Sequence, residues 1–340
     1  MRTYYLDILK GFGVFYVVLG HIVHIPLVVQ YIYSFHVPMF FFISGVLFTP
    51  AKYTSTSQYI QKKVNSLLLP YFFFYTVSLA YWYLVEYRLF GRGGDTTLLQ
   101  EFYFMFSGCV SIAAGALWFL PCLFWVEVLY WFMHHERRKY QGLVCAIIMA
   151  VIGTTFIYYQ FYLQVFGLLQ SFVVIPFFAI GYLLKSKMDA LFQSCLMVKL
   201  SVVCIAVLVQ YLLLADSKFN IGSFEIESHC TYIPIALAGI TFYLMFSFII
   251  KRAFLLEWLG RNSLFIFSFH ALIYRGVIVM ASVCLSISQS ELRESLAYSI
   301  LLTLVTLITM IPMVYIYNHW VAPRLSSYSL IPFNTKQYQR

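Results

Sequence analysis

Charged side chains are scarce in this 340-residue chain. Only 10% of its residues are Asp, Glu, Lys or Arg, whereas a soluble domain carries about 25%. This scarcity excludes a soluble globular protein, and a hydrophobic content of 62% leaves no room for a large domain outside a membrane. A helix needs about 20 apolar residues to cross a bilayer, so this content corresponds to about ten crossings. The apolar runs do not alternate with polar residues, which favours a helical bundle over an outer-membrane barrel.

Several other features are missing. The seven cysteines show no spacing typical of a metal site or a redox pair, so we expect no metal and no permanently bound cofactor. The net charge of +9 comes from short clusters between apolar runs, which argues against nucleic acid as a partner. No small-residue cleavage site follows the first apolar run, so the chain begins with a helix and not with a removable signal. No internal repeat is visible.

We predict an all-α, polytopic membrane protein of ten spans. The predicted spans are residues 8–29, 34–48, 67–87, 116–133, 142–159, 167–184, 200–215, 232–250, 263–285 and 296–318. The predicted organisation is one transmembrane domain over residues 1–320 and a short tail over residues 321–340, with no further soluble domain.

Lys and Arg gather on one side of the predicted membrane. If residue 1 lies in the cytoplasm, 17 of the 22 basic residues fall in cytoplasmic segments, four fall in external loops and Arg275 falls within a span. By the positive-inside rule, this asymmetry places both termini in the cytoplasm. Two external segments, 88–115 and 216–231, are longer than turns. They either frame a site for an acceptor or serve as solvated connectors.

Ionisable residues inside a span are costly and therefore mark candidate functional positions. They are Lys10, His21, His24, His36, Glu127, His270 and Arg275. His21 lies eleven positions after Lys10, which corresponds to three helical turns and about 16 Å along the axis. The two side chains therefore share one face of the first span, with the cation near the cytoplasmic end and the imidazole near the outer end.

This arrangement suits a long acyl donor with an anionic head and a reactive tip, and acyl-coenzyme A has that shape. Its phosphates would be attracted to Lys10, Lys62 and Lys63, and its thioester would reach His21. An imidazole titrates near neutral pH, so it takes a proton from a sugar hydroxyl and returns it to the departing thiolate. The alternative is that His21 only forms a hydrogen bond to a neighbouring helix.

A second histidine strengthens the catalytic interpretation. The second span descends from outside, so His36 enters the membrane at about the depth of His21, and the pair predicts a site in the outer half. Glu127 lies within a span and, if it is ionised, needs a partner such as a His, a Tyr or a cation. The alternative is that it is a protonated structural carboxyl. We interpret Arg275 as structural, because it lies five residues from His270 and does not share its face.

Several segments resemble the acyltransferase 3 family of membrane O-acyltransferases. The family's hallmark is Arg or Lys, ten residues and then His, and Lys10 to His21 fits that pattern. The similar segments are 7–11 with 17–21, 35–45, 117–120, and 259–264 with Phe267 and His270. Their order and span positions match, so the resemblance covers nearly the whole chain. Many members carry two arginines three residues apart before the third span, where this chain has Lys63 and Ser66.

The resemblance implies a bacterial inner-membrane enzyme that takes acetyl groups from acetyl-CoA in the cytoplasm. It would deliver them to hydroxyls of a surface polysaccharide, such as an O-antigen, capsule or exopolysaccharide, or of its lipid-linked precursor. Lys10 would act near the donor and His21 would be catalytic, with His36 orienting it or stabilising charge. Supporting or acceptor-side residues would be Asp7, Ser44, Trp118, Glu127, Asn262, Ser263 and His270. The implied partners are acetyl-CoA, a carbohydrate acceptor and the lipid bilayer.

A protein of another class is the main alternative. A transporter or flippase for a lipid-linked saccharide would use its membrane histidines to bind substrate or relay protons. Transporters commonly break helices with Gly and Pro at paired positions in two halves, and no such pairing is visible. The pattern therefore favours the enzyme, and it leaves open whether the acyl group passes directly to the acceptor or through an acyl-histidine.

Overall fold

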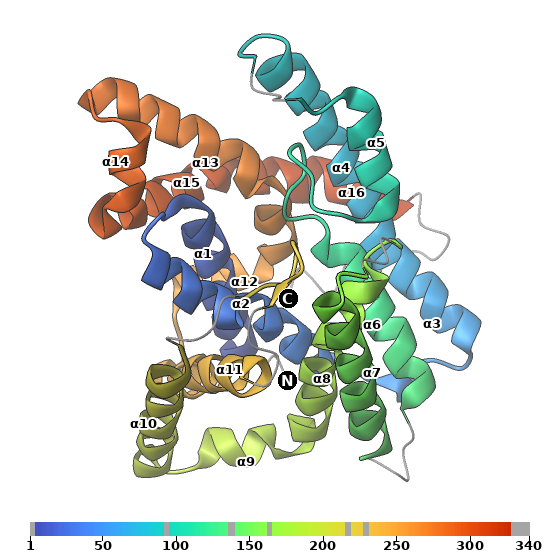
Figure 1. Cartoon of the computed structure of the whole chain (residues 1–340). Helices are drawn as coiled ribbons and strands as arrows, with labels where there is room; N and C mark the ends of the chain where they lie inside the picture. The colour runs from blue at the N-terminus through green and yellow to red at the C-terminus, as the bar shows by residue number, and fades with distance from the viewer. Residues whose placement is uncertain are drawn as a thin grey trace.

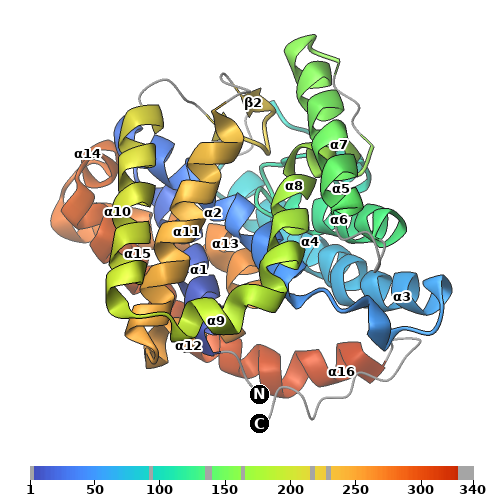
Figure 2. The ribbon, with the colours of Figure 1, turned by 90° about the horizontal axis from the view of Figure 1, so that it is seen from below.

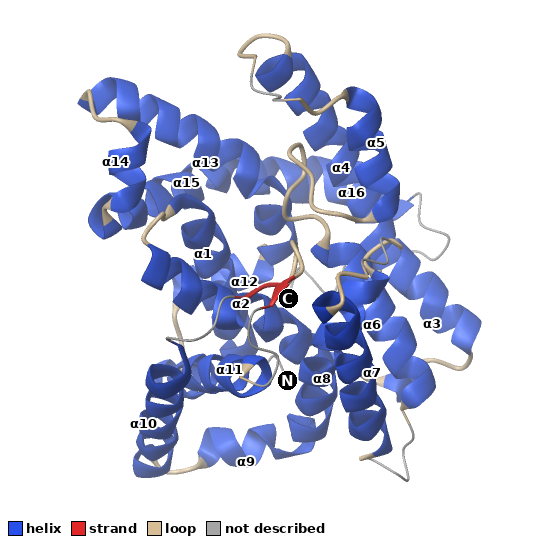
Figure 3. Cartoon of the chain, in the orientation of Figure 1, coloured by secondary structure: helices blue, strands red, loops and turns tan. Residues whose placement is uncertain are grey.

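The computed structural model describes residues 4–91, 95–134, 140–161, 165–214, 219–226 and 231–327. Helices make up most of this part of the chain, together with one small antiparallel hairpin (Figure 3). Within the described residues, nine helical segments are long and apolar enough to cross a membrane. The prediction of an all-helical polytopic membrane protein is therefore confirmed.

The helices are α1 Tyr4–Ile22, α2 Pro26–Leu47, α3 Thr56–Lys63, α4 Leu69–Tyr81, α5 Leu98–Ser107, α6 Phe119–Met133, α7 Gln141–Tyr158, α8 Leu168–Leu184, α9 Met188–Gln193, α10 Leu196–Leu213, α11 Tyr232–Ile250, α12 Phe254–Arg261, α13 Ser263–Leu285, α14 Gln289–Glu294, α15 Leu296–Ile316 and α16 Ala322–Ser327. The hairpin pairs β1 Phe219–Asn220 with β2 Glu225–Ile226. A π-helical stretch, Val64–Leu68, joins α3 to α4, and a second one, Trp82–Tyr87, continues α4, so that one helical segment runs from Thr56 to Tyr87.

Ten spans were predicted, one more than the nine long helical segments among the described residues. The fourth predicted span, residues 116–133, corresponds to α6, which has only 15 residues and is about 22 Å long. The hydrocarbon core of a bilayer is about 30 Å thick, so α6 is too short to cross it alone. The other nine predicted spans each correspond to one of the nine long helical segments.

Three predicted span boundaries were wrong. The first span was predicted to continue to residue 29 and the second to begin at residue 34, but α1 ends at Ile22 and α2 begins at Pro26. Proline suits the first position of a helix, because an N–H at that position would have no partner within the helix and because the φ of proline already has a helical value. The third span was predicted to begin at residue 67, but its helical segment begins at Thr56, where the Ser55 hydroxyl accepts the Gln58 N–H at 3.2 Å.

The helices form two groups with α2 and α8 between them. In two perpendicular views, α1, α10, α11 and α13–α15 lie on one side and α3–α7 on the other (Figures 1 and 2). Helix α1 is central, because 12 of its 19 residues are buried and it packs against α2, α11, α12 and α13. In contrast, α10 buries only three residues and presents an apolar surface suited to lipid.

Glycines allow α1 and α12 to touch backbone to backbone. A Cβ atom at Gly11 would overlap the Leu256 carbonyl, and one at Gly260 would overlap the Asp7 carbonyl. Helices α1 and α12 therefore contact each other through a glycine on each side. Small residues at helix contacts are typical of membrane proteins, where close packing replaces the hydrophobic effect as the driving force.

Candidate functional site

A pocket lies among α1, α2, α13, the hairpin and the loop before α6. Its walls are Val17 and His21 of α1, Tyr33, His36 and Val37 of α2, Val110, Gly115, Ala116 and Trp118 of that loop, Asn220, Ile221 and Ser223 around the hairpin turn, and Phe267 of α13. The structure thus brings together three predicted site residues that are far apart in the sequence, His21, His36 and Trp118. Both long segments that the sequence predicts to be external contribute to the walls.

Helix α13 places two rings beside His21. The ring centroids of His21 and His270 are 5.0 Å apart, with an angle of 44° between the ring planes. Tyr274, one turn further along α13, lies nearly parallel to His21 at 6.1 Å. His270 itself is completely buried. His270 is therefore a direct neighbour of the predicted catalytic histidine, although the two are 249 residues apart.

Backbone carbonyls fix the tautomers of two of the histidines. The Nδ1 atom of His36 lies 2.7 Å from the Ile32 carbonyl, and Nδ1 of His270 lies 2.8 Å from the Phe267 carbonyl. A carbonyl only accepts hydrogen bonds, so Nδ1 carries the hydrogen in both rings. In the neutral form each ring then presents the lone pair of Nε2. Both side chains are suited to accept a hydrogen bond at Nε2.

The ring of His21 differs from the other two. Across the described part of the chain, neither of its nitrogens makes a hydrogen bond, and the side chain is only half-buried against the pocket. Its tautomer is therefore not fixed by its own backbone. No carbonyl of its own helix engages either ring nitrogen of His21, so a neighbouring side chain can select which nitrogen carries the hydrogen and which presents the lone pair.

Helix α14 holds the end of α1 that carries His21. The Arg293 guanidinium donates to the carbonyls of His21 and Ile22, both at 2.9 Å. The His24 N–H donates to the Arg293 carbonyl at 2.8 Å. The last carbonyls of a helix have no partner within it, and positive charge is favourable beside them. Arg293 therefore fixes the last turn of α1 and the position of His21.

Charged side chains also hold the pocket wall formed by the loop before α6. The Ile112 N–H donates to Glu101 Oε1 at 3.1 Å, and the Ile112 carbonyl accepts from Arg275 Nη2 at 3.0 Å. Arg275 is also paired with Glu86 at 2.8 Å. Both carboxylates are buried, and burial raises the pKa of Glu101. This loop is thus held at both backbone polar groups of one residue, Ile112.

The aromatic ring of Trp118 closes another wall of the pocket. Gly222, in the hairpin turn, packs against it so closely that a Cβ atom there would lie 2.9 Å from Trp118 Nε1. The pocket wall therefore depends on a contact between the loop before α6 and the hairpin. Ser44 lies eight residues beyond His36 on α2 and does not line the pocket.

The predicted donor residues lie elsewhere. Lys10 is half-buried on α1, and within the described residues its ammonium group makes no hydrogen bond or ion pair. Lys63 pairs with Glu127 at 2.8 Å, and the Tyr59 hydroxyl donates to the same carboxylate at 2.6 Å. Glu127 thus has both a tyrosine and a cation as partners. Lys62 is half-buried beside Lys63 on α3.

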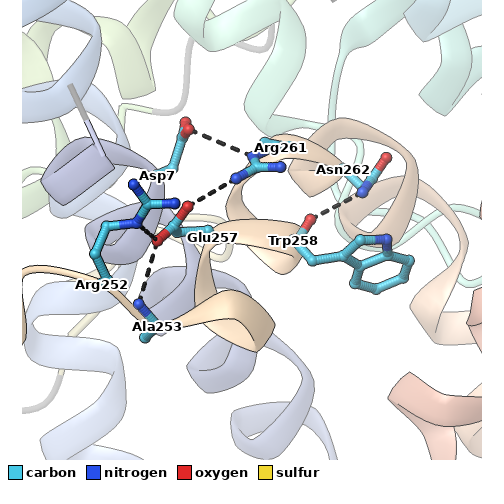
Figure 4. Close-up of polar contacts among 7 residues, drawn as sticks. All are labelled: Asp7, Arg252, Ala253, Glu257, Trp258, Arg261 and Asn262. Carbon is cyan, nitrogen blue, oxygen red and sulfur yellow. Dashed lines mark hydrogen bonds and ion pairs between the residues drawn. The ribbon is translucent and has the colours of Figure 1, made fainter. Parts of the chain in front are cut away.

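Asp7 and Asn262 belong to a separate cluster at the beginning of α1 (Figure 4). Arg261 lies 3.7 Å from the Asp7 carboxylate and 2.7 Å from that of Glu257, which also accepts from Arg252 at 3.1 Å. The Asn262 amide donates to the Trp258 carbonyl at 2.8 Å. The contact of Arg261 with Asp7 ties α12 to α1, and the others lie within the segment of α12.

Neither Asp7 nor Asn262 lines the pocket of His21. Ser263 follows at the first position of α13 and does not line the pocket either. The sequence therefore grouped residues that the structure separates into a pocket and a helix-docking cluster.

Sequence reasoning missed four side chains around the pocket. They are Glu86, Glu101, Tyr274 and Arg293. Tyr274 could have been predicted from the sequence, because it lies four residues after His270 and therefore on the same face of the helix. Glu86 sits inside a predicted span and belonged among the candidate residues. Glu101 and Arg293 lie in connectors, where no periodic pattern indicates which side chains turn inward.

Long apolar helices around a histidine-lined pocket define a membrane protein with an internal site for a polar reaction. The family model described as an acyltransferase domain matches residues 3–314. This chain therefore belongs to the acyltransferase 3 family and is a membrane acyltransferase. Comparisons with the curated proteins and with the solved structures found no match. Among the described residues, no three His, Cys, Asp or Glu side chains converge as a metal site requires.

Proposed function

We propose that this acyltransferase moves an acetyl group from acetyl-CoA to a hydroxyl of a surface polysaccharide or of its lipid-linked precursor, in a bacterial inner membrane. The observation that supports this proposal most directly is the pocket shared by His21 and His36. It lies at the end of α1 opposite to Asp7, and its walls include both long segments predicted to be external. Such a pocket is suited to a bulky acceptor that arrives from outside.

The donor would follow one face of α1. Asp7, Lys10, Val17 and His21 are spaced by three, seven and four residues, which places them along one stripe of the helix. Val17 and His21 line the pocket at one end, and Lys10 lies about 16 Å away towards the other. With its ammonium group unpaired among the described residues, Lys10 is available to a phosphate of coenzyme A while the thioester lies beside His21.

In the mechanism we favour, His21 is a general base and then a general acid. Its unprotonated ring nitrogen takes the proton of the acceptor hydroxyl as the hydroxyl oxygen forms a bond to the acetyl carbonyl carbon. The carbon–sulfur bond then breaks, the electron pair leaves with sulfur, and the thiolate takes the proton from the His21 imidazolium. His36 presents the Nε2 lone pair and so suits the role of orienting a hydroxyl; in its neutral form it has no hydrogen there to give to an oxyanion.

The deciding experiment measures transfer from labelled acetyl-CoA by purified protein and ester content on surface glycans of cells. The wild type is expected to release free coenzyme A and to esterify the glycan fraction, whereas H21A loses at least 100-fold in rate. H24A is the matched control, since this exposed histidine lies one turn away and does not line the pocket. An H21A variant that keeps most of its activity would contradict the assignment of the base. Saccharide flux without loss of thioester would favour the transporter.

A further inference from the structure

His270 keeps one hydrogen-bonding atom buried and unpaired. The ring is completely buried, its Nδ1 donates to the Phe267 carbonyl at 2.8 Å, and its Nε2 has no partner among the described residues. A buried acceptor without a partner gives up its hydrogen bonds to water and receives none in return. Retention of such an atom beside a reactive centre therefore needs an explanation, and packing does not provide one, because an apolar side chain would fill the same space.

His21 is nearer to His270 than the rings of Phe267 and Tyr274, which lie 6.2 and 6.1 Å from His270 between centroids. Nδ1 of His270 contacts carbonyls three and four residues earlier on its own helix, and in an imidazole Nε2 points away from Nδ1. Nε2 therefore points away from the α13 backbone. The His21 ring is 5.0 Å away, tilted by 44°, whereas Tyr274 lies nearly parallel to the His21 ring and contacts its face. Of these two neighbours on α13, only His270 is inclined so that an edge-on hydrogen bond to His21 is within reach of a small ring rotation.

We propose that His270 is a positioning residue for His21: its Nε2 accepts the N–H of His21 and fixes both the orientation and the tautomer of that ring. This inference rests on the proposed function, in which His21 is the base. A neutral imidazole has one N–H and one lone pair, so directing the N–H towards His270 leaves the lone pair on the nitrogen that faces the pocket. That nitrogen takes the hydroxyl proton and later returns it, while His270 neither gains nor loses a proton.

Hydrolases with a catalytic triad have a comparable arrangement, in which a buried group orients the catalytic histidine and selects its tautomer. In this protein the orienting group is a neutral imidazole held by its own helix instead of a carboxylate. His36 is less suited to this role, since it faces the pocket and its ring contacts Tyr33, at 5.0 Å between centroids.

The test compares H270N with H270Q in the full-length protein. Asparagine places an amide nitrogen near the position of Nδ1 and so keeps the bond to the Phe267 carbonyl, but it has nothing at the position of Nε2. Glutamine reaches the position of Nε2 with an oxygen that accepts. We expect H270N to lose at least tenfold in kcat with labelled acetyl-CoA and H270Q to remain within about threefold of the wild type. The KM for acetyl-CoA stays within twofold in both variants, because His270 does not touch the donor.

Two results would overturn the positioning role: wild-type kcat in H270N, or equal losses in both variants when both are folded. An inactive wild type would instead contradict the proposed function itself, so the two failures are distinguishable. A measurement on the wild-type protein covers the case in which H270N does not fold. Histidine labelled with nitrogen-15 should show a protonated His21 nitrogen in contact with an unprotonated Nε2 of His270, and the absence of that contact would contradict the inference.

Discussion

Glu127 illustrates how a carboxylate is kept inside a membrane protein. Its side chain is 7% exposed, and the ion pair with Lys63 and the hydrogen bond from Tyr59 compensate for its burial. Tyr59 in turn stacks on Trp131, with ring centroids 4.2 Å apart. Removing one partner of such a pair leaves the other charge buried, which costs more than the pair contributes.

Replacing Glu127 with alanine should therefore lower stability by about 3 kcal/mol, because Lys63 would be left buried without its partner. The measurement is the midpoint of thermal unfolding in detergent. E294A serves as the control, since Glu294 is exposed on α14, and it should shift the midpoint by less than one degree. A double variant, K63M/E127M, should recover most of the loss, and a double variant as unstable as E127A would show that the ion pair is not the cause.

The buried carboxyl of Glu101 leads to a second prediction at the residue scale. Burial raises the pKa of its carboxyl, so the folded protein favours the protonated form. The wild-type protein therefore loses stability as the pH rises from the ordinary carboxyl pKa through the raised value. Glutamine keeps an acceptor for the Ile112 N–H and cannot ionise. The unfolding midpoint of E101Q should therefore rise relative to the wild type between pH 5 and pH 8, whereas E101A should be less stable at both values. A constant difference between E101Q and the wild type over this range would contradict the prediction.

The sequence predicted the relation of Lys10 to His21 because both lie on one helix, where spacing alone determines the shared face. It did not predict that Lys63 is bound to Glu127, since that contact joins segments 64 residues apart. The proximity of His270 to His21 was hidden for the same reason. Residue types and spacing identify which side chains matter, whereas their pairings depend on how the helices pack.

At the scale of elements, the long apolar helices were predictable and the short helices were not. Helices α5, α12 and α14 have ten, eight and six residues, too few for a periodic pattern to stand out. Yet α12 supports α1, and α14 holds the turn that carries His21. The supporting structure of the site therefore lies largely in the segments from which sequence patterns reveal least.

The contact of α1 with α12 gives a prediction for these elements. Gly260→Ala should destabilise the protein by about 2 kcal/mol, because the added methyl group would overlap the Asp7 carbonyl and force the helices apart. Gly276→Ala is the matched control, since nothing lies within 4 Å of its added Cβ and alanine favours a helix. Thermal unfolding of the two variants should therefore shift in opposite directions. A G260A protein as stable as the wild type would show that the two helices separate at little cost.

At the scale of the whole molecule, α6 explains how the pocket is built. If the chain crosses ten times, as the distribution of Lys and Arg predicts, α6 is too short to complete its crossing alone, and the non-helical loop that precedes it must extend to membrane depth. Irregular backbone at that depth is tolerated only when it is buried in protein or lines a water-filled cavity. The Ile112 N–H and carbonyl of this loop are satisfied within the protein by Glu101 and Arg275, and Gly115 and Ala116 line the pocket.

Helix α6 also decides the topology. Nine crossings would place the two termini on opposite sides of the membrane, whereas ten place them on the same side, as the distribution of Lys and Arg predicts. Fusions of a reporter that is active only after export, placed after Gly91, His134 and Ser194, distinguish the two arrangements. We expect activity after Gly91 and none after His134 or Ser194, with a cytoplasm-dependent fluorescent reporter giving the reverse pattern. Export of the His134 fusion would mean that α6 does not cross, and that the basic segments flanking it do not determine the orientation of the chain.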